Sequence, residues 1–600
     1  MSKDTKQVDT ITLTVDGIEV KTTKGKRILE AALNAGIYIP SLCALRDIKL
    51  PFGACRLCQV QIEGRRGTIT ACSEPATDGM IVHSNTPEVN SLRRRILEMM
   101  LARHPHECLT CWRKKRCQPF DICLRNVSIA ERCVTCAKNR HCELQKVSDF
   151  IGLDTMPYPY TPKGLPVEME NPFIVRNNNL CILCGRCIRV DQEVLGFEAI
   201  AFNLRGAKTY IGGAFGKPLI ESGCTFCGSC VEVCPTGALM DRGKEWEQPV
   251  DREALSIRCK YNCPARVDVP RFIRFIRDKK YAEAVAVIRE SVPFAAVCSL
   301  ICEHPCESEG ACRRGDLDQP VAIRALERFA VERSGKYEYI EDSKAAPSDK
   351  KIAIVGSGPT GLTAAYYLAR KGGHKVSVLE KLPKAGGMMR AAIPEYVLPR
   401  KVIEAEIGSL RSLGVEIKIR SKVESIDDLF EQGFDVVFLA VGAAPEIPNK
   451  FGIALNKEKH IEVNPESLMT IRKGVFAGGD VVTGNISFIE SVASGRKAAI
   501  SIDRYLGGSG IISETLAPII EGIPRVGRID NFAQRKRQEM PSQALAEHMG
   551  NFTQIELGFT DELGNEEAKR CMGCDLRFAV ARLISSPEYK IAAKTTVQLE

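Results

Sequence analysis

The start of the chain alternates apolar and polar positions. Residues 10–22, TITLTVDGIEVKT, place an Asp-Gly pair between two alternating stretches. Alternation with a period of two is typical of strands with one buried face, and Asp-Gly favours a tight two-residue turn. The pattern therefore predicts a β-hairpin.

Two later stretches show other periods. Val269, Phe272, Ile273 and Ile276 recur at the spacing of one helix face, which predicts an amphipathic helix. Residues 352–355 are a short apolar run followed by a glycine-rich turn, which predicts a buried strand leading into a helix.

Length and composition favour a globular protein of several domains. At 600 residues and 44% apolar content, the chain predicts about four domains. No apolar run reaches the roughly 18 to 20 residues that cross a bilayer, and MSKDTKQVDT lacks a signal-like apolar stretch. We therefore expect a soluble cytoplasmic protein.

The 26 cysteines change this picture most. In a reducing compartment they indicate metal or redox chemistry rather than disulfides. The net charge of +9 does not indicate nucleic acid binding, because thiolate-bound clusters would offset it. The basic runs at 93–95 and 113–116 are then interpreted as solvated faces beside anionic cofactors.

The first cysteine group is spaced C-x11-C-x2-C-x13-C and follows the predicted hairpin. Four thiolates from loops around a small sheet suit a [2Fe-2S] cluster, and a structural zinc ion is the alternative. The predicted ligands are Cys43, Cys55, Cys58 and Cys72.

The next run, HPHECLTCWRKKRC, has the spacing H-x3-C-x2-C-x5-C. Here the chain resembles the N-terminal region of the large iron-sulfur subunit of respiratory complex I and of related iron hydrogenases and formate dehydrogenases. The resemblance implies a [4Fe-4S] cluster bound by His104, Cys108, Cys111 and Cys117. A neutral imidazole in place of a thiolate should raise its potential.

A second run, CVTCAKNRHC, repeats the C-x2-C-x5-C spacing. We interpret it as a duplicated [4Fe-4S] site whose fourth ligand is the nearest unassigned cysteine. The predicted ligands are Cys123, Cys133, Cys136 and Cys142.

Two bacterial ferredoxin runs follow, CILCGRCIRVD at 181–191 and CTFCGSCVEVCP at 224–235. In this pattern the fourth cysteine of each run ligates the other cluster. One predicted [4Fe-4S] site has Cys181, Cys184, Cys187 and Cys234, and the other has Cys224, Cys227, Cys230 and Asp191. An empty second site with a solvated Asp191 is the alternative.

From residue 250 the chain resembles the helical iron-sulfur domain of the glutamate synthase small subunit, the transhydrogenase subunit and dihydropyrimidine dehydrogenase. The resemblance rests on CKYNCPARVDVPRFIRFI, VCSLICEHPCESEGAC and VAIRALERF. In that family an E-A-x-R-C-x-x-C segment precedes the domain, whereas here it stands at residues 567–574.

This resemblance implies two further [4Fe-4S] sites. Their ligands would be Cys259, Cys312, Cys571 and Cys574 in one, and Cys263, Cys302, Cys306 and Glu327 in the other. The C-terminal pair has two alternatives, a redox dithiol or half of a zinc site. For Glu327 the alternative to an iron ligand is an ordinary salt-bridge partner on a basic helix face. Cys298 is left as a core residue, and the total is one [2Fe-2S] and six [4Fe-4S] clusters.

The sequence KIAIVGSGPTGLTAAYYLARKGGHKVSVLEK predicts a dinucleotide fold, with strand, glycine turn, helix and a terminal acid. FLAVGAAP at 438–445 and GVFAGGDVVTG at 474–484 resemble the flavin domain of the same family, which implies FAD. There an aspartate binds the ribityl chain, and Gly386 and Gly387 match a loop over the flavin. The predicted FAD residues are Gly356, Gly358, Pro359, Thr360, Gly361, Glu380, Lys381, Gly387, Gly442, Asp480 and Ser487.

The nicotinamide domain of that family has no counterpart in the sequence. Only 31 residues separate Gly442 from Gly474, whereas a nucleotide domain needs on the order of 100. We therefore expect a chain without its own NADPH site.

The fold class predicted is multidomain α+β and α/β. It combines a β-grasp [2Fe-2S] ferredoxin domain at 1–90, a cluster region at 91–170, a bacterial-type 2×[4Fe-4S] ferredoxin domain at 171–249, a helical iron-sulfur domain at 250–343, a Rossmann-like FAD domain at 344–515 and a C-terminal strap at 516–600.

The predicted function is electron transfer between FAD, clusters and partner subunits of an oxidoreductase complex. The partners expected are a catalytic subunit of formate dehydrogenase or hydrogenase type and a flavin/NAD subunit or ferredoxin, with electron bifurcation as one form of the role. No catalytic residues, nucleic acid or membrane span are expected. The alternatives are a self-sufficient NAD(P)H:acceptor oxidoreductase and a zinc-rich scaffold.

Overall fold

The computed structural model describes residues 9–243, 251–302, 306–335, 345–443 and 451–584. The chain forms two compact units, and its C-terminal part returns to both. Unit 1 comprises Met1–Leu255, Glu521–Gln534 and Met572–Glu600, and unit 2 comprises Ser256–Ile520 and Arg535–Cys571. The domain boundaries predicted at 249/250 and 343/344, and the last 16 residues of the predicted strap, lie outside the described residues.

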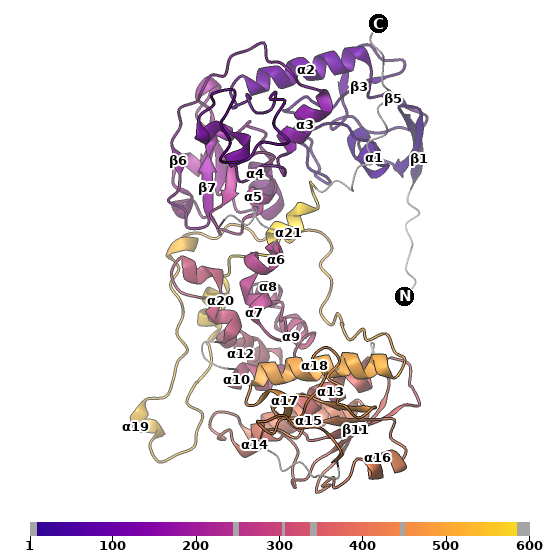
Figure 1. The fold of residues 1–600 in the computed structure, drawn as a ribbon. Coiled ribbons are helices and arrows are strands. Elements are labelled where there is room, and N and C mark those ends of the chain that lie inside the picture. The colour runs from indigo at the N-terminus through magenta and orange to yellow at the C-terminus, as the bar shows by residue number, and fades with distance from the viewer. Residues whose placement is uncertain (1–8, 244–250, 303–305, 336–344, 444–450, 585–600) are drawn as a thin grey trace. The chain divides into compact units, whose positions relative to one another are not determined.

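Unit 1 begins with the predicted hairpin, which the structure confirms. Strands β1 (Thr10–Val15) and β2 (Ile18–Thr23) pair antiparallel, and Asp16 and Gly17 form the turn with φ of 50° and 80° (Figure 1). The sheet has the order β2-β1-β5-β3-β4, completed by β3 (Gln59–Ile62), β4 (Ile69–Thr70) and β5 (Ile81–His83). Helix α1 (Ile28–Asn34) shares its core.

Helix α2 (Pro87–Leu101) follows this sheet, and its N-terminus is capped by the Thr86 hydroxyl. Its Arg93 is 1% exposed and donates hydrogen bonds to the carbonyls of Leu57, Gln59 and Ser84. A buried guanidinium with three backbone acceptors fixes α2 to the strand that follows the predicted cluster loop. The expectation of a solvated basic face at 93–95 is therefore wrong for Arg93.

The rest of unit 1 is built from short elements. They are α3 (Glu143–Ile151), the antiparallel sheet β10-β7-β6 (Leu239–Asp241, Ile174–Asn177, Val167–Glu168), the pair β8 and β9 (Ile200–Asn203, Tyr210–Gly213), α4 (Arg186–Arg189) and α5 (Ser229–Glu232). Helix α21 (Leu576–Ala581) packs on α5, where the buried Arg577 donates to both oxygens of Asp241 at 2.8 and 2.7 Å. The C-terminal segment is therefore an integral part of this unit.

Unit 2 contains a helical part and a parallel sheet. Its helices include α7 (Arg258–Asn262), α8 (Val269–Arg277), α9 (Tyr281–Arg289), α10 (Ala295–Ile301), α12 (Ile323–Ser334) and α20 (Asp561–Ala568). The amphipathic α8 is confirmed, because Val269, Phe272, Ile273 and Ile276 are all buried. The Asp268 side chain accepts the Arg271 amide and so caps this helix.

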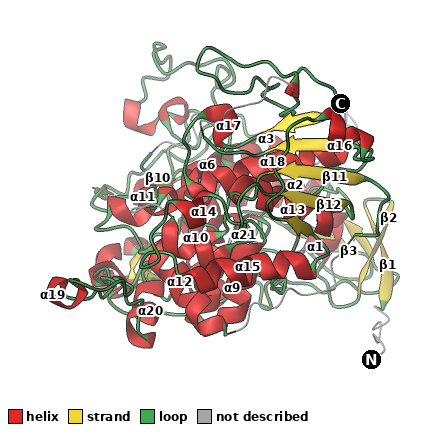
Figure 2. Ribbon diagram, turned by 90° about the horizontal axis from the view of Figure 1, so that it is seen from below, coloured by secondary structure: helices red, strands yellow, loops and turns green. Residues whose placement is uncertain are grey.

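The parallel sheet of unit 2 has the order β13-β12-β11-β14-β15. The strands are Glu416–Lys418, Lys375–Leu379, Lys351–Val355, Val436–Leu439 and Val475–Ala477. Helices α13 (Pro359–Arg370), α15 (Arg400–Ser412) and α18 (Phe488–Tyr505) cover it, and Figure 2 shows strands β11 and β12 among helices. This confirms the strand and helix predicted around 352–370.

The stretch between β14 and β15 is short of regular structure. Described residues 452–473 form isolated bridges only, one between Leu455 and Ile461 and one from Met469 to Phe476 of β15. Residues 444–450, which include the end of the FLAVGAAP segment, lie outside the described residues.

Among the helices described, none has both the length and the apolar character needed to cross a membrane.

Candidate metal centres and flavin site

The four cysteines of the predicted two-iron site are all buried in unit 1. The Leu42 amide donates to the Cys55 sulfur at 3.3 Å and the Cys55 amide donates to the Cys43 sulfur at 3.4 Å. The Cys43 thiol and nearby amides lower the pKa of Cys55 to about 6, although burial opposes this. The same pairing raises the pKa of Cys43, so the fit rests on geometry: four buried sulfurs lie together here, and two of them accept backbone amides, as suits a cluster held by cysteines.

His104 is buried, and its Nδ1 lies 2.9 Å from the Pro105 carbonyl oxygen. Burial lowers the pKa of His104 to about 4. The imidazole is therefore neutral at pH 7, with Nε2 available as a ligand atom. This state fits the predicted role of His104.

The two C-x2-C-x5-C runs meet in the structure. Hydrogen bonding with the Cys133 thiol lowers the pKa of Cys108 to about 6, although burial opposes this, so the first cysteines of the runs lie side by side. In the second run, Cys142 donates to the Pro235 carbonyl at 3.5 Å, and Cys136 lies against Gly237. The assignment of one cluster to each run stays a prediction.

The ferredoxin region brings one predicted ligand set together. The lining of one cavity in this region includes Cys181, Cys184, Cys187 and Cys234. These cysteines come from two runs about 50 positions apart in sequence, as the crossed bacterial pattern requires.

Asp191 is buried rather than solvated. It is 7% exposed, and its Oδ2 accepts the amides of Ala199 and Ile200 at 2.7 and 3.0 Å. Burial raises the pKa of Asp191 to about 7, and Cys224, Cys227 and Cys230 lie within its electrostatic reach. The alternative of a solvated Asp191 is therefore wrong, and iron ligation by Asp191 stays a prediction.

Unit 2 contains a second cavity with several cysteines in its lining. Its lining includes Cys263, Cys298, Cys302, Cys306 and Glu327. Burial raises the pKa of Glu327 to about 8, and within the described residues its carboxylate forms no ion pair. Its position does not fit the salt-bridge alternative. Cys298, taken from the sequence as a core residue, lines the same cavity.

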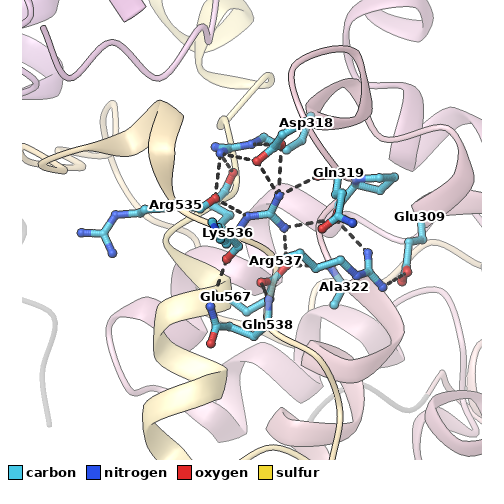
Figure 3. A network of polar contacts seen from close by, with 12 residues as sticks. Glu309, Asp318, Gln319, Ala322, Arg535, Lys536, Arg537, Gln538 and Glu567 are labelled. Carbon is cyan, nitrogen blue, oxygen red and sulfur yellow. Dashed lines mark hydrogen bonds and ion pairs between the residues drawn. The ribbon is translucent and has the colours of Figure 1, made fainter. Parts of the chain in front are cut away.

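The E-A-K-R-C segment is fastened inside unit 2 by a buried polar network (Figure 3). Glu567 and Arg570 are both 0% exposed. The Glu567 carboxylate accepts the amides of Ala322 at 2.8 Å and Gln538 at 2.7 Å, and pairs with Arg570 at 2.8 Å. Arg570 also donates to the carboxylate of Asp318 and to the carbonyls of Gln319, Pro320 and Arg535.

This network places Cys571 in the helical core of unit 2. Cys259, Cys312 and Cys571 pack against the same hydrophobic cluster. Cys574, the fourth predicted ligand, is buried in the segment that belongs to unit 1. Within the described residues no three His, Cys, Asp or Glu side chains close on a single-ion site.

The glycine turn between β11 and α13 forms a narrow backbone cradle. A Cβ at Gly356 would lie 2.3 Å from the Ala440 oxygen, and one at Gly361 would lie 2.2 Å from the Gly356 oxygen. A Cβ at Gly387 would lie 2.7 Å from the Gly358 Cα. Only glycine fits these positions, as a pyrophosphate site at a helix N-terminus requires. Pro359 and Thr360 begin α13.

The other predicted FAD residues differ in whether their polar groups already have hydrogen-bond partners within the protein. Asp480 Oδ1 is buried with no hydrogen-bond partner among the described residues, which fits a ribityl hydroxyl. The Glu380 carboxylate accepts the amides of Ser357 at 3.1 Å and Leu382 at 2.8 Å, and the Ser487 hydroxyl caps α18. Lys381 is exposed, and Gly442 follows β14 with φ of +84°.

Sequence patterns did not reveal the buried arginines of the polar network. Arg314 and Arg570 are fully buried, and Arg537 pairs with Glu309 and donates to Pro320. The only sequence signal was the arginine directly before Cys571.

Comparison with family models matches five segments of the chain. They are a 2Fe-2S iron-sulfur cluster binding domain (8–87), an NADH-ubiquinone oxidoreductase-G iron-sulfur binding region (93–119), an NADH-quinone oxidoreductase subunit 3 ferredoxin-like domain (171–240), a dihydropyrimidine dehydrogenase domain II with a 4Fe-4S cluster (253–339) and a pyridine nucleotide-disulphide oxidoreductase domain (326–498).

Several curated proteins are similar to the chain. The NADP(+)-dependent formate dehydrogenase subunit beta of Moorella thermoacetica is 27% identical over 611 positions, covering 69% of this chain and 85% of that protein. The NADPH-Fe(3+) oxidoreductase subunits alpha and beta of Geobacter sulfurreducens are 34% and 33% identical over 241 and 298 residues. These matches cover 39% and 47% of this chain but only 25% and 39% of those proteins.

Proposed function

Because the chain joins iron-sulfur domains of the NADH-quinone oxidoreductase type to a pyridine nucleotide-disulphide oxidoreductase domain, we propose that it is an electron-transfer subunit of a cytoplasmic oxidoreductase complex. It would carry one FAD, one [2Fe-2S] and about six [4Fe-4S] clusters. The observation that carries the proposal is the cavity lined by Cys181, Cys184, Cys187 and Cys234.

A bound flavin exchanges electrons in pairs or singly, and each cluster carries one electron at a time. Gly356, Gly358 and Gly361 would hold the FAD pyrophosphate, and Asp480 would hold its ribityl chain. The cysteines described above would hold the clusters, with His104, Asp191 and Glu327 as the non-thiolate ligands. The chain would then divide into the six regions expected from the sequence.

The short connection between β14 and β15 supports a chain without its own nicotinamide domain. The match to the Moorella thermoacetica subunit runs over 611 positions yet uses only 69% of this chain, so it contains long gaps on this chain's side. A missing inserted domain accounts for such gaps. Electrons would then reach the flavin from a partner protein rather than from NADPH bound by this chain.

The names of the relatives indicate the kind of partner. The relatives described above are subunits of formate dehydrogenase and NADPH-Fe(3+) oxidoreductase, and a subunit of the NADP-reducing hydrogenase of Solidesulfovibrio fructosivorans is 33% identical over 241 residues. We infer a catalytic subunit of formate dehydrogenase or hydrogenase type, with a flavin/NAD subunit or ferredoxin as a further partner. Flavin-based electron bifurcation is one form that this exchange could take.

Anaerobic stopped-flow mixing tests the proposal on the purified, iron-loaded chain. NADH or NADPH alone should leave the flavin absorbance unchanged, whereas dithionite or reduced ferredoxin should bleach it. Iron and flavin analysis should give about 26 irons and one FAD per chain, from one two-iron and six four-iron clusters. Rapid bleaching by NADPH would instead support a self-sufficient NAD(P)H oxidoreductase, and zinc in place of iron would support a scaffold.

A further inference from the structure

A buried arginine lies beside a core that two of the candidate metal sites of unit 1 share. Arg186, the first residue of α4, is 3% exposed. The hydrophobic core in this part of the unit contains Cys43 and Cys55 of the predicted two-iron site together with Cys184 of the predicted four-iron site. The two sites therefore share one packed interior.

Helix α4 packs on the loop that carries the two-iron cysteines. A Cβ at Gly185 would lie 2.8 Å from the Phe52 ring, and the Arg189 guanidinium lies 6.0 Å from the centre of the same ring. Arg189 also donates to the Leu50 carbonyl. These contacts fix the start of α4 a few residues from Cys55, independently of any bound metal.

The Arg186 guanidinium is charged, and only part of its hydrogen-bonding capacity is used by the described residues. Its Nη1 donates to Glu143 Oε1 at 2.7 Å, and its Nε is buried with no hydrogen-bond partner in the part of the chain that the structure describes. Although burial opposes the charge, Glu143, Cys184 and Cys43 hold the pKa of Arg186 above its ordinary value. Arg186 stands between Cys184 and Cys187 in sequence, and its partner Glu143 follows Cys142, which packs in the core that also contains Cys43, Cys55 and Cys184. A buried cation, whose Nε–H has no acceptor among the described residues, therefore lies beside the core that the two sites share.

We propose that Arg186 is a positioning residue shared by the [2Fe-2S] site and the adjacent [4Fe-4S] site, and that it raises the reduction potentials of both together. The inference rests on the proposed function, since it needs both clusters to be present. Adding an electron makes a cluster more negative, and a cation held in a low-dielectric interior stabilises that state. Glu143, at the start of α3, offsets part of this effect with its negative charge.

Substitutions of Arg186 and of Glu143 should shift the cluster reduction potentials in opposite directions. In a potentiometric titration of the full-length, iron-loaded chain with dithionite, followed by electron paramagnetic resonance, Arg186→Gln should move both midpoint potentials to more negative values. Glu143→Gln should move both to more positive values, and Arg186→Lys should stay close to the parent. The control is Arg205→Gln, because Arg205 is an exposed arginine of the same unit, and both potentials should stay unchanged in it.

Unmoved potentials in both Arg186→Gln and Glu143→Gln, with both signals intact, would overturn the inference, as would a shift confined to one centre. If Arg186→Gln fails to fold, Glu143→Gln decides the question, because its carboxylate is 30% exposed and tolerates an isosteric amide. Absence of both signals from the parent chain, with no iron bound, would instead mean that the proposed function is wrong.

Discussion

The Glu567 carboxylate accepts the backbone amide of Ala322 at 2.8 Å, although 245 positions separate the two residues. The contact ties the C-terminal segment to the start of α12, in the core that also receives Cys571. A fully buried carboxylate with amide and guanidinium donors is satisfied without iron. Glu567 and Arg570 therefore hold the E-A-K-R-C segment in place through contacts that need no metal. The predicted cluster ligands Cys571 and Cys574 come directly after these two anchoring residues.

Removing Glu567 should undock this segment. In Glu567→Ala the amides of Ala322 and Gln538 lose their acceptor, and Arg570 keeps only the Asp318 carboxylate. Each buried donor left unsatisfied costs about 1–3 kcal/mol. We expect a lower thermal midpoint and loss of about four irons, the content of one cluster, with all cysteines still present. The control is Glu566→Ala, because Glu566 is 44% exposed and pairs with Lys569 on the surface. Full iron content in Glu567→Ala would contradict the docking role.

Replacing Cys571 and Cys574 together with serine tests the predicted cluster directly. About four irons should be lost while FAD stays bound, because the flavin cradle draws on neither cysteine. Cys298→Ser should keep all the iron, since the predicted ligand sets exclude it. Loss of zinc from the double variant, or of no metal, would restore the zinc-site or dithiol alternatives.

The glycine cradle makes a sharp prediction for flavin binding. Gly361→Ala would place a methyl group 2.2 Å from the Gly356 carbonyl oxygen, so the turn must open and FAD content should fall severalfold. Gly408→Ala in α15 is the control, because no atom lies within 4 Å of its added methyl. That change should retain FAD and stabilise the helix by roughly 0.5–1 kcal/mol. Parent-level FAD in Gly361→Ala, measured by flavin absorbance, would show that the cradle does not hold it.

A buried ion pair should dominate the stability of the flavin-binding part. Arg370 and Glu514 are 0% and 1% exposed, with Nε and Oε2 2.9 Å apart, and Tyr366 donates to Glu514 at 2.8 Å. Glu514→Ala removes the carboxylate that pairs with Arg370 and the acceptor of the Tyr366 hydroxyl, and breaking a buried ion pair in this way costs about 3–5 kcal/mol.

The measurement for this pair is the thermal midpoint of FAD release, which should fall clearly in Glu514→Ala. The exposed pair of Lys375 and Asp349 supplies the control, and Lys375→Ala should leave the midpoint unchanged because solvent screens it. Equal midpoints for the two variants would disprove a dominant role for the buried pair.

Local spacing along the chain was enough to predict several parts of this protein. The hairpin at 10–23, helix α8 and the strand and glycine turn at 351–361 follow from hydrophobic periods and turn residues, which act over a few positions. The cysteine runs likewise identified the metal chemistry, because each run carries several ligands a few residues apart.

The way in which distant segments combine became clear only from the folded chain. Folding buried Asp191 and Arg186, placed Cys298 beside Glu327, and brought Cys108 to Cys133. It also fastened residues 567–570 to the loop at 318–322. These arrangements depend on burial and on pairing between residues far apart in sequence, and such contacts leave no periodic signal in the chain.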